Sequence, residues 1–165
     1  YKLQDQFFKF WFKYILPNKS RIEEGRIAYV LNLTMEDFNT LVAENFEHIT
    51  QEIVLKNEDK FFPIDKIGRW WDKSEEIDSV AFNENEDKIL FGEVKWSNKP
   101  VGTNIYDDLK RKAKLVEWGT EKRKEYFCLF SKSGFTDEMK KVAKKDGVAL
   151  FEEDKLLILE EKNEQ

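Results

Sequence analysis

The chain has 165 residues, a formal net charge of −5 and 15% aromatic residues, which predicts one folded domain with a sizeable core. The single cysteine, Cys128, excludes an internal disulfide and a cysteine-based zinc site, and the single histidine, His48, excludes a multi-histidine metal site. Any metal must therefore be held by oxygen, which favours Mg²⁺ or Mn²⁺. Because the charge is acidic, binding to a polyanion would need local clusters of Lys and Arg.

The sequence shows no signal peptide and no apolar run long enough to span a bilayer, so we expect a cytoplasmic protein with no membrane partner. Lys far outnumbers Arg and Glu is abundant, which resembles the surface composition of hyperthermophile proteins. The chain starts with Tyr1 rather than Met, so we expect either a piece of a longer protein or a start that lies upstream.

Residues 5–16 predict a helix that is apolar and aromatic around most of its circumference. Asp5, Lys9 and Lys13 recur every four residues and form one narrow polar stripe. Pro17 and Asn18 are expected to end the helix. We interpret its apolar surface as packed on its own domain, and the alternative is a contact to another domain.

Residues 20–33 predict a second helix, interrupted near Gly25. Thr34, with Asp37 three residues later, has the pattern of a capping box, which predicts a third helix from Thr34 to about Leu55. Apolar residues at intervals of three and four form its buried face: Met35, Phe38, Val42, Phe46, Ile49 and Ile53. Glu47 lies beside this face and can point along the surface of a sheet.

The rest of the chain alternates predicted strands and helices. Residues 65–72, 76–82 and 88–96 are expected to be strands, the last two forming a hairpin. A loop at 97–102, helix 103–118, strand 125–131, helix 136–145 and two short strands at 148–151 and 155–159 follow. The order α-β-β-β-α-β-α-β predicts an α/β fold, a mixed central sheet flanked by helices.

The strand 88–96 carries the strongest chemical signal. Its apolar run from Ile89 to Phe91 indicates a strand covered on both faces, and Glu93 and Lys95 then point to one common face. The hairpin can place Asp78 of the neighbouring strand beside Glu93. Two adjacent carboxylates repel each other unless a cation lies between them, and a lysine beside them can orient water or stabilise charge on a phosphate. This trio therefore predicts metal-dependent phosphodiester hydrolysis.

The alternative is a purely structural domain in which Glu93 and Lys95 form an exposed ion pair, as most such pairs on strands do. The apolar surroundings favour a functional site, and so do Asp78 on the preceding strand and Glu47 on the preceding helix.

The order of these residues resembles the PD-(D/E)XK nuclease superfamily, with Glu47 on a helix, then Ile77-Asp78, then Glu93-Val94-Lys95. Flanking words over nearly the whole chain are similar to the archaeal and bacterial domain of unknown function 234: Phe10-Trp11-Phe12 with Pro17-Asn18, Ile22-Glu23-Glu24-Gly25, Phe46-Glu47, Gly68-Arg69-Trp70-Trp71, Glu76-Ile77-Asp78 and Gly92-Glu93-Val94-Lys95-Trp96. The resemblance implies a restriction-endonuclease-like core with an N-terminal helical extension. It also implies the C-terminal part of a P-loop ATPase, although this chain has no Walker motif.

The resemblance also implies roles for the candidate catalytic residues. Asp78 and Glu93 would be ligands of Mg²⁺ or Mn²⁺, Lys95 the lysine that faces phosphate or water, and Glu47 an accessory acid. Ile77 stands where the motif has proline, and no Gln-x-x-x-Tyr follows the core. The implied function is a metal-dependent nuclease-like domain acting on DNA, and the alternative is an inactive module that binds nucleic acid or protein.

Four basic residues near the site are candidate nucleic-acid contacts, Lys99, Lys110, Arg111 and Lys114, and the same helix also carries Lys112. The alternative for the last three is the solvated face of an amphipathic helix. Trp70 and Trp71 face opposite sides of their strand, so one belongs to the core. The other can stack on a base, and the favoured alternative is packing in the core or against a partner.

The predicted domain organisation has three parts. Residues 1–33 form an aromatic-rich helical segment that links to a missing ATPase or winged-helix part, residues 34–160 form the nuclease-like domain, and residues 161–165 form a polar tail. The expected partners are DNA and the P-loop ATPase domain of the same full-length chain, and self-association stays open.

Overall fold

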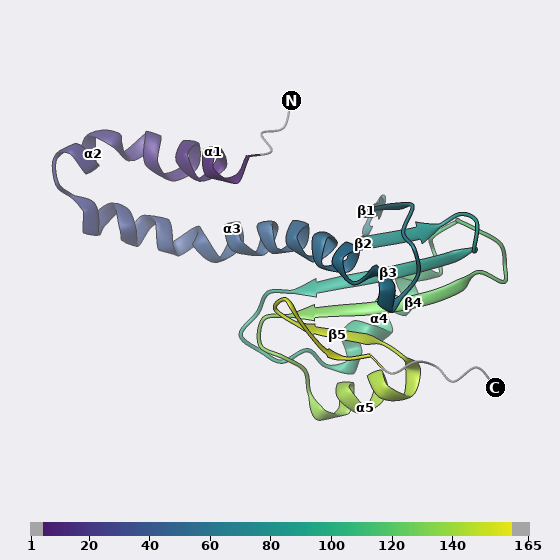
Figure 1. The fold of residues 1–165 in the computed structure, drawn as a ribbon. Helices are drawn as coiled ribbons and strands as arrows, with labels where there is room; N and C mark the ends of the chain where they lie inside the picture. The colour runs from purple at the N-terminus through teal and green to yellow at the C-terminus, as the bar shows by residue number, and fades with distance from the viewer. Residues whose placement is uncertain (1–4, 160–165) are drawn as a thin grey trace. The chain divides into compact units, whose positions relative to one another are not determined.

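The computed structural model describes residues 5–159, except for the side chains of Glu36 and Glu44 (Figure 1). The predicted polar tail, 161–165, lies outside the described residues. The chain divides into two compact units, residues 1–45 and 46–165, which are considered separately. Within the described range, no helix has the length and apolar character that crossing a membrane requires.

The first unit begins with a run of short helical segments. These are α1 (Gln6–Phe10), the π-helical turn η1 (Trp11–Ile15), the 3₁₀ turn η2 (Leu16–Asn18) and α2 (Lys19–Glu23). The prediction that Pro17 ends the first helix is wrong. Pro17 lies in the first turn of η2, where its missing N–H breaks no hydrogen bond, so the chain stays helical to Glu23.

Helix α3 (Ile27–Lys56) is one continuous helix, so the predicted cap at Thr34 is also wrong. The Thr34 hydroxyl donates to the Val30 carbonyl at 2.9 Å, the bond that a threonine makes inside a helix. Of the predicted buried face, Phe46 and Ile53 are buried, whereas Met35 and Ile49 are exposed. The residues of α3 from Phe46 onward belong to the second unit.

The aromatic surface of the first segments is not packed away, which contradicts our interpretation that it is buried on its own domain. Exposed large apolar side chains follow one another here: Phe7, Phe8, Trp11, Phe12 and Leu16. Phe7 and Trp11 stack on each other, with ring centroids 6.2 Å apart, but both rings remain open on the outside. The alternative, a contact surface for another domain, fits this exposure.

The second unit is built on a six-stranded mixed sheet with the order β1-β2-β3-β4-β5-β6. The strands are β1 (Lys66–Asp72), β2 (Glu75–Asn83), β3 (Lys88–Lys95), β4 (Lys124–Ser131), β5 (Ala149–Glu152) and β6 (Lys155–Ile158). β3–β4 and β4–β5 are parallel, and the other pairs are antiparallel. The antiparallel pairing of β2 with β3 confirms the predicted hairpin. The order α3-β1-β2-β3-α4-β4 confirms the predicted α/β class with its order α-β-β-β-α-β and its mixed central sheet.

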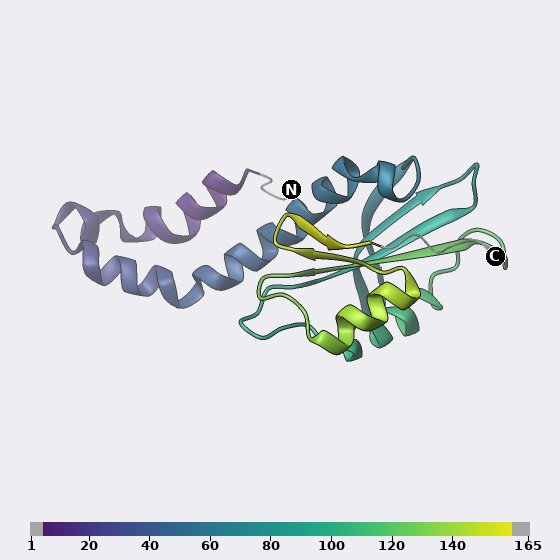
Figure 2. The ribbon, with the colours of Figure 1, turned by 60° about the horizontal axis from the view of Figure 1, so that its bottom comes forward.

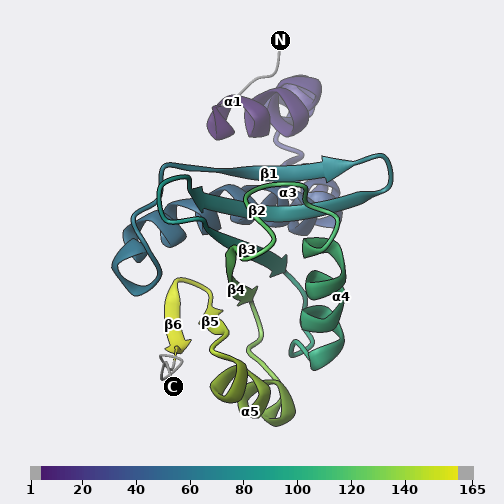
Figure 3. The same cartoon turned by 90° about the vertical axis from the view of Figure 1, so that its right-hand side faces the viewer.

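Helices cover both faces of the sheet (Figures 2 and 3). On one side α4 (Thr103–Ala113) and α5 (Asp137–Asp146) pack on a core that includes Ile89 and Phe91 of β3. On the other side the C-terminal part of α3 and the segment around η3 (Glu58–Lys60) pack on Leu90 and Val94. The apolar run of β3 is therefore buried on both faces, as predicted.

Helix α4 ends at Ala113, five residues before the predicted end at 118. The guanidinium of Arg123, the residue before β4, donates to the carbonyl groups of Ala113, Val116 and Trp118 at 2.6–3.0 Å. The Arg123 side chain therefore donates to carbonyl groups that, in a longer helix, would accept from backbone N–H groups of the helix.

Candidate active site

Asp78 lies in a β-bulge of β2. Two residues of β2, Asp78 and Ser79, lie opposite the single residue Arg69 of β1. The extra residue shifts the alternation of side chains by one, which explains why Ile77 and Val80 both pack in the core under α4. A bulge re-aims the side chain at its position, so the local backbone of β2 decides where the Asp78 carboxylate points.

The bulge brings Asp78 to the end of β3 that carries the Glu-x-Lys pair. The last paired residues of the two strands are Ser79 and Gly92. Beyond them, the Oδ2 atom of Asp78 accepts a hydrogen bond of 2.8 Å from the backbone N–H of Val94. Both acids are buried, since Asp78 is 9% and Glu93 6% exposed. The structure therefore brings Asp78, Glu93 and Lys95 together.

The carboxylate of Glu93 accepts from two ammonium groups. Lys95 Nζ lies 2.7 Å from Glu93 Oε1, and Lys112 Nζ, from α4, lies 3.3 Å from Oε2. Lys112 was noted in the sequence as a basic residue of its helix, but its contact with Glu93 was not predicted. A signal for it exists in the sequence, because Lys112 follows Leu109 by three residues and precedes Ala113, so it borders the apolar stripe of its helix.

The surroundings of Asp78 disfavour its charged form. Burial is the largest cause that raises the pKa of Asp78, to about 6, and the negative charges of Glu93 and Glu47 add to it. The Val94 N–H and Lys95 act in the opposite direction without cancelling the shift. A further cation near Asp78 would relieve this repulsion.

The residues present fit a hard divalent cation. Mg²⁺ is commonly bound by one or two carboxylates and keeps several waters, and Asp78 and Glu93 supply two buried carboxylates. Over residues 5–159, no group of three or more His, Cys, Asp or Glu side chains could hold a metal ion. The sequence-predicted third acid, Glu47, is therefore not part of one ligand cluster with the other two.

Glu47 approaches the bulge from α3 but is engaged by an arginine. Arg69 Nη1 lies 3.4 Å from Glu47 Oε2, and Arg69 also donates to Glu76 of β2. Helix α3 also touches the site through Gln51, whose amide donates to the Asp78 carbonyl at 3.3 Å. Arg69 and Gln51 were not predicted, because their partners lie on other elements and leave no local pattern.

Two of the four predicted nucleic-acid contacts are held by acids of the protein. Arg111 donates to both carboxylate oxygens of Glu75, at 2.7 and 3.0 Å, and Lys110 lies 2.9 Å from Asp107. The other two, Lys99 and Lys114, are exposed.

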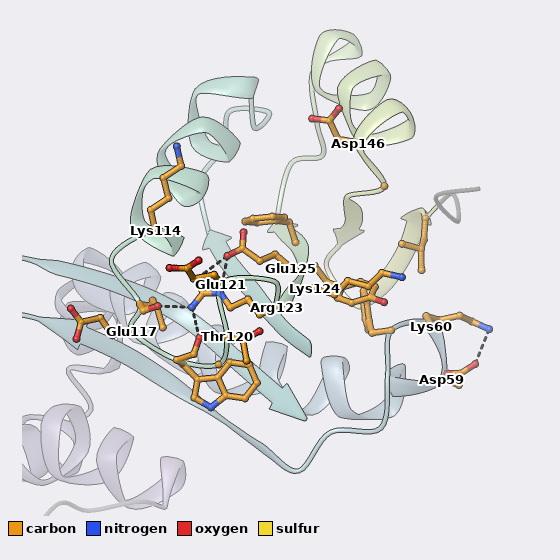
Figure 4. Close-up of a pocket in the computed structure, with 18 residues that line it drawn as sticks. Asp59, Lys60, Lys114, Glu117, Thr120, Glu121, Arg123, Lys124, Glu125 and Asp146 are labelled. Carbon is orange, nitrogen blue, oxygen red and sulfur yellow. Dashed lines mark hydrogen bonds and ion pairs between the residues drawn. The ribbon is translucent and has the colours of Figure 1, made fainter. Parts of the chain in front are cut away.

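A pocket lies away from these acids, at the start of β4 (Figure 4). It has a volume of about 1500 Å³, and Lys114, Trp118 and Arg123 are among the residues that line it. Neither Asp78 nor Glu93 lines it, so Lys114 belongs to a different surface region from the candidate catalytic residues.

The raised pKa of Asp78 predicts a pH-dependent stability. Its folded pKa of about 6 lies above the ordinary value of 3.8, so the folded state binds more protons between these values and the free energy of unfolding falls as the pH rises through them. Asp78→Asn removes this charge and keeps an oxygen to accept from Val94. Its stability relative to wild type should rise by up to roughly 3 kcal/mol between pH 4 and pH 7. Urea unfolding in EDTA measures this difference, and a difference that does not change with pH would contradict it.

Comparisons with known proteins fit the motifs of the sequence. Residues 11–114 match the model of the domain of unknown function 234, described as archaea bacterial proteins of unknown function. An uncharacterized protein of Methanocaldococcus jannaschii is 39% identical over 137 residues, which is 80% of this chain but 30% of that protein. The crystal structure of a repair endonuclease from Pyrococcus abyssi is similar at 14% identity and a TM-score of 0.40, over 62% of this chain and 44% of the other. The chain spans less than a third of the length of the relative that it matches, and it belongs to the family of the domain of unknown function 234.

Proposed function

We propose that the second unit is a divalent-metal-dependent nuclease domain that cleaves DNA phosphodiester bonds. The observation that supports the proposal is the convergence of Asp78, Glu93 and Lys95 at the bulged end of β2. Asp78 is bonded to the backbone of Val94, which lies between Glu93 and Lys95 on the next strand, and these two pair with each other. Burying two like charges together is costly for a fold, so their presence indicates a use that repays it.

Each residue has a role that follows from its surroundings. Asp78 and Glu93 would hold Mg²⁺ or Mn²⁺, which supplies a Lewis acid for the phosphate and lowers the pKa of a water molecule. Lys95 is 39% exposed at its side chain, so its ammonium group can reach a phosphate oxygen from Glu93. Arg69 holds Glu47 in an ion pair, and the charge of Glu47 adds to burial and to the charge of Glu93 in raising the pKa of Asp78.

The test is cleavage of branched, duplex and single-stranded DNA with Mg²⁺, Mn²⁺ or EDTA. We expect products only with a divalent cation, and none with Glu93→Gln, which removes one carboxylate and keeps the shape of the side chain. A thermal melt should also show a higher midpoint with Mn²⁺ for the wild type than for Glu93→Gln, because binding stabilises the folded state. Equal cleavage by both proteins would indicate a contaminant and overturn the proposal.

The exposed Trp71 supports a substrate with an unpaired base. Trp71 is 73% exposed on the edge strand β1 and lies opposite Glu76, the residue that accepts from Arg69. It therefore shares a face with Arg69, and Glu76 is two residues from Asp78 along β2. An aromatic side chain at this place can stack on a base near the cleaved phosphate.

Trp71→Ala should therefore weaken binding to single-stranded DNA by about 1–3 kcal/mol, the value of one stacked base. Stability should change by no more than about 0.5 kcal/mol, because the side chain is on the surface. Fluorescence anisotropy of a labelled strand and a thermal melt measure the two effects. Leu157→Ala, an exposed apolar residue on the opposite edge strand β6, is the matched control. Unchanged binding by Trp71→Ala would exclude a stacking role.

A second candidate function is supported by the first unit. Within residues 5–45, ten large apolar side chains are exposed: Phe7, Phe8, Trp11, Phe12, Leu16, Ile27, Tyr29, Leu31, Leu33 and Met35. Clusters of exposed apolar residues mark interaction sites. In this alternative the chain is a noncatalytic binding module, and these residues contact the P-loop ATPase part of the full-length protein.

Replacing Phe7, Phe8, Trp11 and Phe12 together with Ser tests this second function. The changes should abolish co-purification with the separately expressed ATPase part and leave DNA cleavage unchanged. Light scattering on the wild type would reveal self-association through the same residues. If the quadruple variant still captures the ATPase part as the wild type does, this surface is not the contact.

A further inference from the structure

Lys112 lies between two acids and contacts both. Its ammonium group is 3.3 Å from Glu93 Oε2 and 3.4 Å from Asp108 Oδ2, and its side chain is 12% exposed. Glu93 is buried, whereas the side chain of Asp108 is 45% exposed. Burial by itself lowers the pKa of Lys112, but the charges of Glu93 and Asp108 outweigh it and raise the pKa, so the ammonium group stays protonated.

The contact to Glu93 conflicts with the binding of a metal ion. Both oxygens of Glu93 already accept from ammonium groups, one from Lys95 and one from Lys112. A divalent cation on Glu93 would meet the charge of Lys112 only a few ångströms away, in a buried region where screening is weak. A divalent cation on Glu93 therefore weakens the contact between Glu93 and Lys112.

Asp108 is a second acceptor within reach of the same ammonium group. It is fixed by Arg111, whose Nε donates to Asp108 Oδ1 at 2.9 Å, and Arg111 is itself anchored on Glu75 of β2. Lys112 can therefore give up Glu93 and keep an ion pair with Asp108. The movement needs only a rotation of its flexible side chain.

We propose that Lys112 is a resident cation of the site, which holds Glu93 in the metal-free protein and shifts to Asp108 when a divalent cation binds. Lys112 is then a positioning residue that limits metal affinity and keeps the empty site stable. The inference rests on the proposed function for the identity of the incoming ion, but it concerns the binding of the ion and not the cleavage of DNA.

The affinity of the protein for Mn²⁺, measured from the electron paramagnetic resonance signal of free Mn²⁺, tests the proposal. Lys112→Met should bind Mn²⁺ about tenfold more tightly, because the competing charge is gone. Asp108→Asn should bind Mn²⁺ roughly three- to tenfold more weakly, because Lys112 loses its second acceptor and stays on Glu93. Two changes in one ion-paired network thus shift the affinity in opposite directions.

Lys110 and Asp107 provide matched controls, because they form an ion pair of 2.9 Å on the same helix. Lys110→Met and Asp107→Asn change the net charge by the same amounts and measure the long-range effect alone. In the double variant Lys112→Met/Asp108→Asn, the second change should have only the effect of Asp107→Asn. An affinity of Lys112→Met equal to that of Lys110→Met would overturn the proposal.

Lys112→Gln is a second variant in case Lys112→Met does not fold. Its amide can still donate to Glu93, while the positive charge is lost. Its affinity for Mn²⁺ should rise as in Lys112→Met, and its melting midpoint shows whether it is folded. If the variants bind Mn²⁺ as expected and no protein cleaves DNA, the proposed function fails and this inference stands. If the wild type cleaves DNA and a folded Lys112→Gln shows no tighter binding than Lys110→Met, only this inference fails. If no protein binds Mn²⁺, both fail.

Discussion

Lys95→Met should lower metal-dependent DNA cleavage by about 10²–10³-fold, the usual loss when one charge that stabilises the transition state is removed. The ammonium group of Lys95 pairs with Glu93, and the Lys95 side chain is 39% exposed. This group is therefore both close to the acids and accessible to a substrate. Its ion pair with Glu93 is short, at 2.7 Å, so the ammonium group has a fixed place relative to the site. Single-turnover cleavage with saturating Mn²⁺ measures the loss.

The affinity for Mn²⁺ separates a role in catalysis from a role in binding the metal. In Lys95→Met the affinity should be kept or increased, because a positive charge beside Glu93 is removed, while cleavage is lost. Lys141→Met is the control, as an exposed lysine of α5, outside the candidate contacts, at which the same change removes one positive charge. If Lys95→Met cleaves DNA at the rate of Lys141→Met, Lys95 has no part in the reaction.

Phe91→Ala should lower the free energy of unfolding by about 3–5 kcal/mol, the largest change in stability that we expect from one substitution. Phe91 is fully buried on the central strand β3, and its ring lies 5.7 Å from that of Phe127. The guanidinium carbon of Arg123 lies 5.6 Å from the Phe91 ring centroid. The truncation loses the burial of the ring and leaves a cavity that rigid neighbours on β4 and α4 cannot fill.

Urea unfolding at pH 7 measures this loss, with Phe12→Ala as the matched control. Phe12 is 53% exposed, so the same truncation there should cost no more than about 0.5 kcal/mol. A loss below about 1 kcal/mol for Phe91→Ala would mean that the core under α4 can collapse around the missing ring. It would also weaken the view that β3 is a rigid support for Glu93 and Lys95.

The candidate site was only partly readable from the chain. Glu93 and Lys95 are two residues apart on a strand, so their common face follows from local geometry alone, and their ion pair bears this out. The place of Asp78 depended on a hairpin, which the sequence also indicated. The orientation of the Asp78 side chain depends on the bulge opposite Arg69, and no local pattern in residues 76–82 indicates the extra residue.

Helix boundaries were less predictable than helix positions, for a similar reason. Pro17 and Thr34 are residue types that often end or begin helices, but both also fit inside one when their backbone or side-chain bonds are satisfied. The early end of α4 is set by Arg123, which comes from ten residues further along the chain.

The sequence by itself determined the α/β order, the family, the central hairpin and the pair Glu93 and Lys95, because periodicity and short spacings encode which side chains share a face. The tertiary structure alone decided that Asp78 is buried with a raised pKa, that Arg69 holds Glu47, and that Lys112 of α4 shares Glu93 with Lys95. Those contacts join elements distant in sequence. Burial and charge at such a junction depend on how the elements pack, which no local pattern specifies.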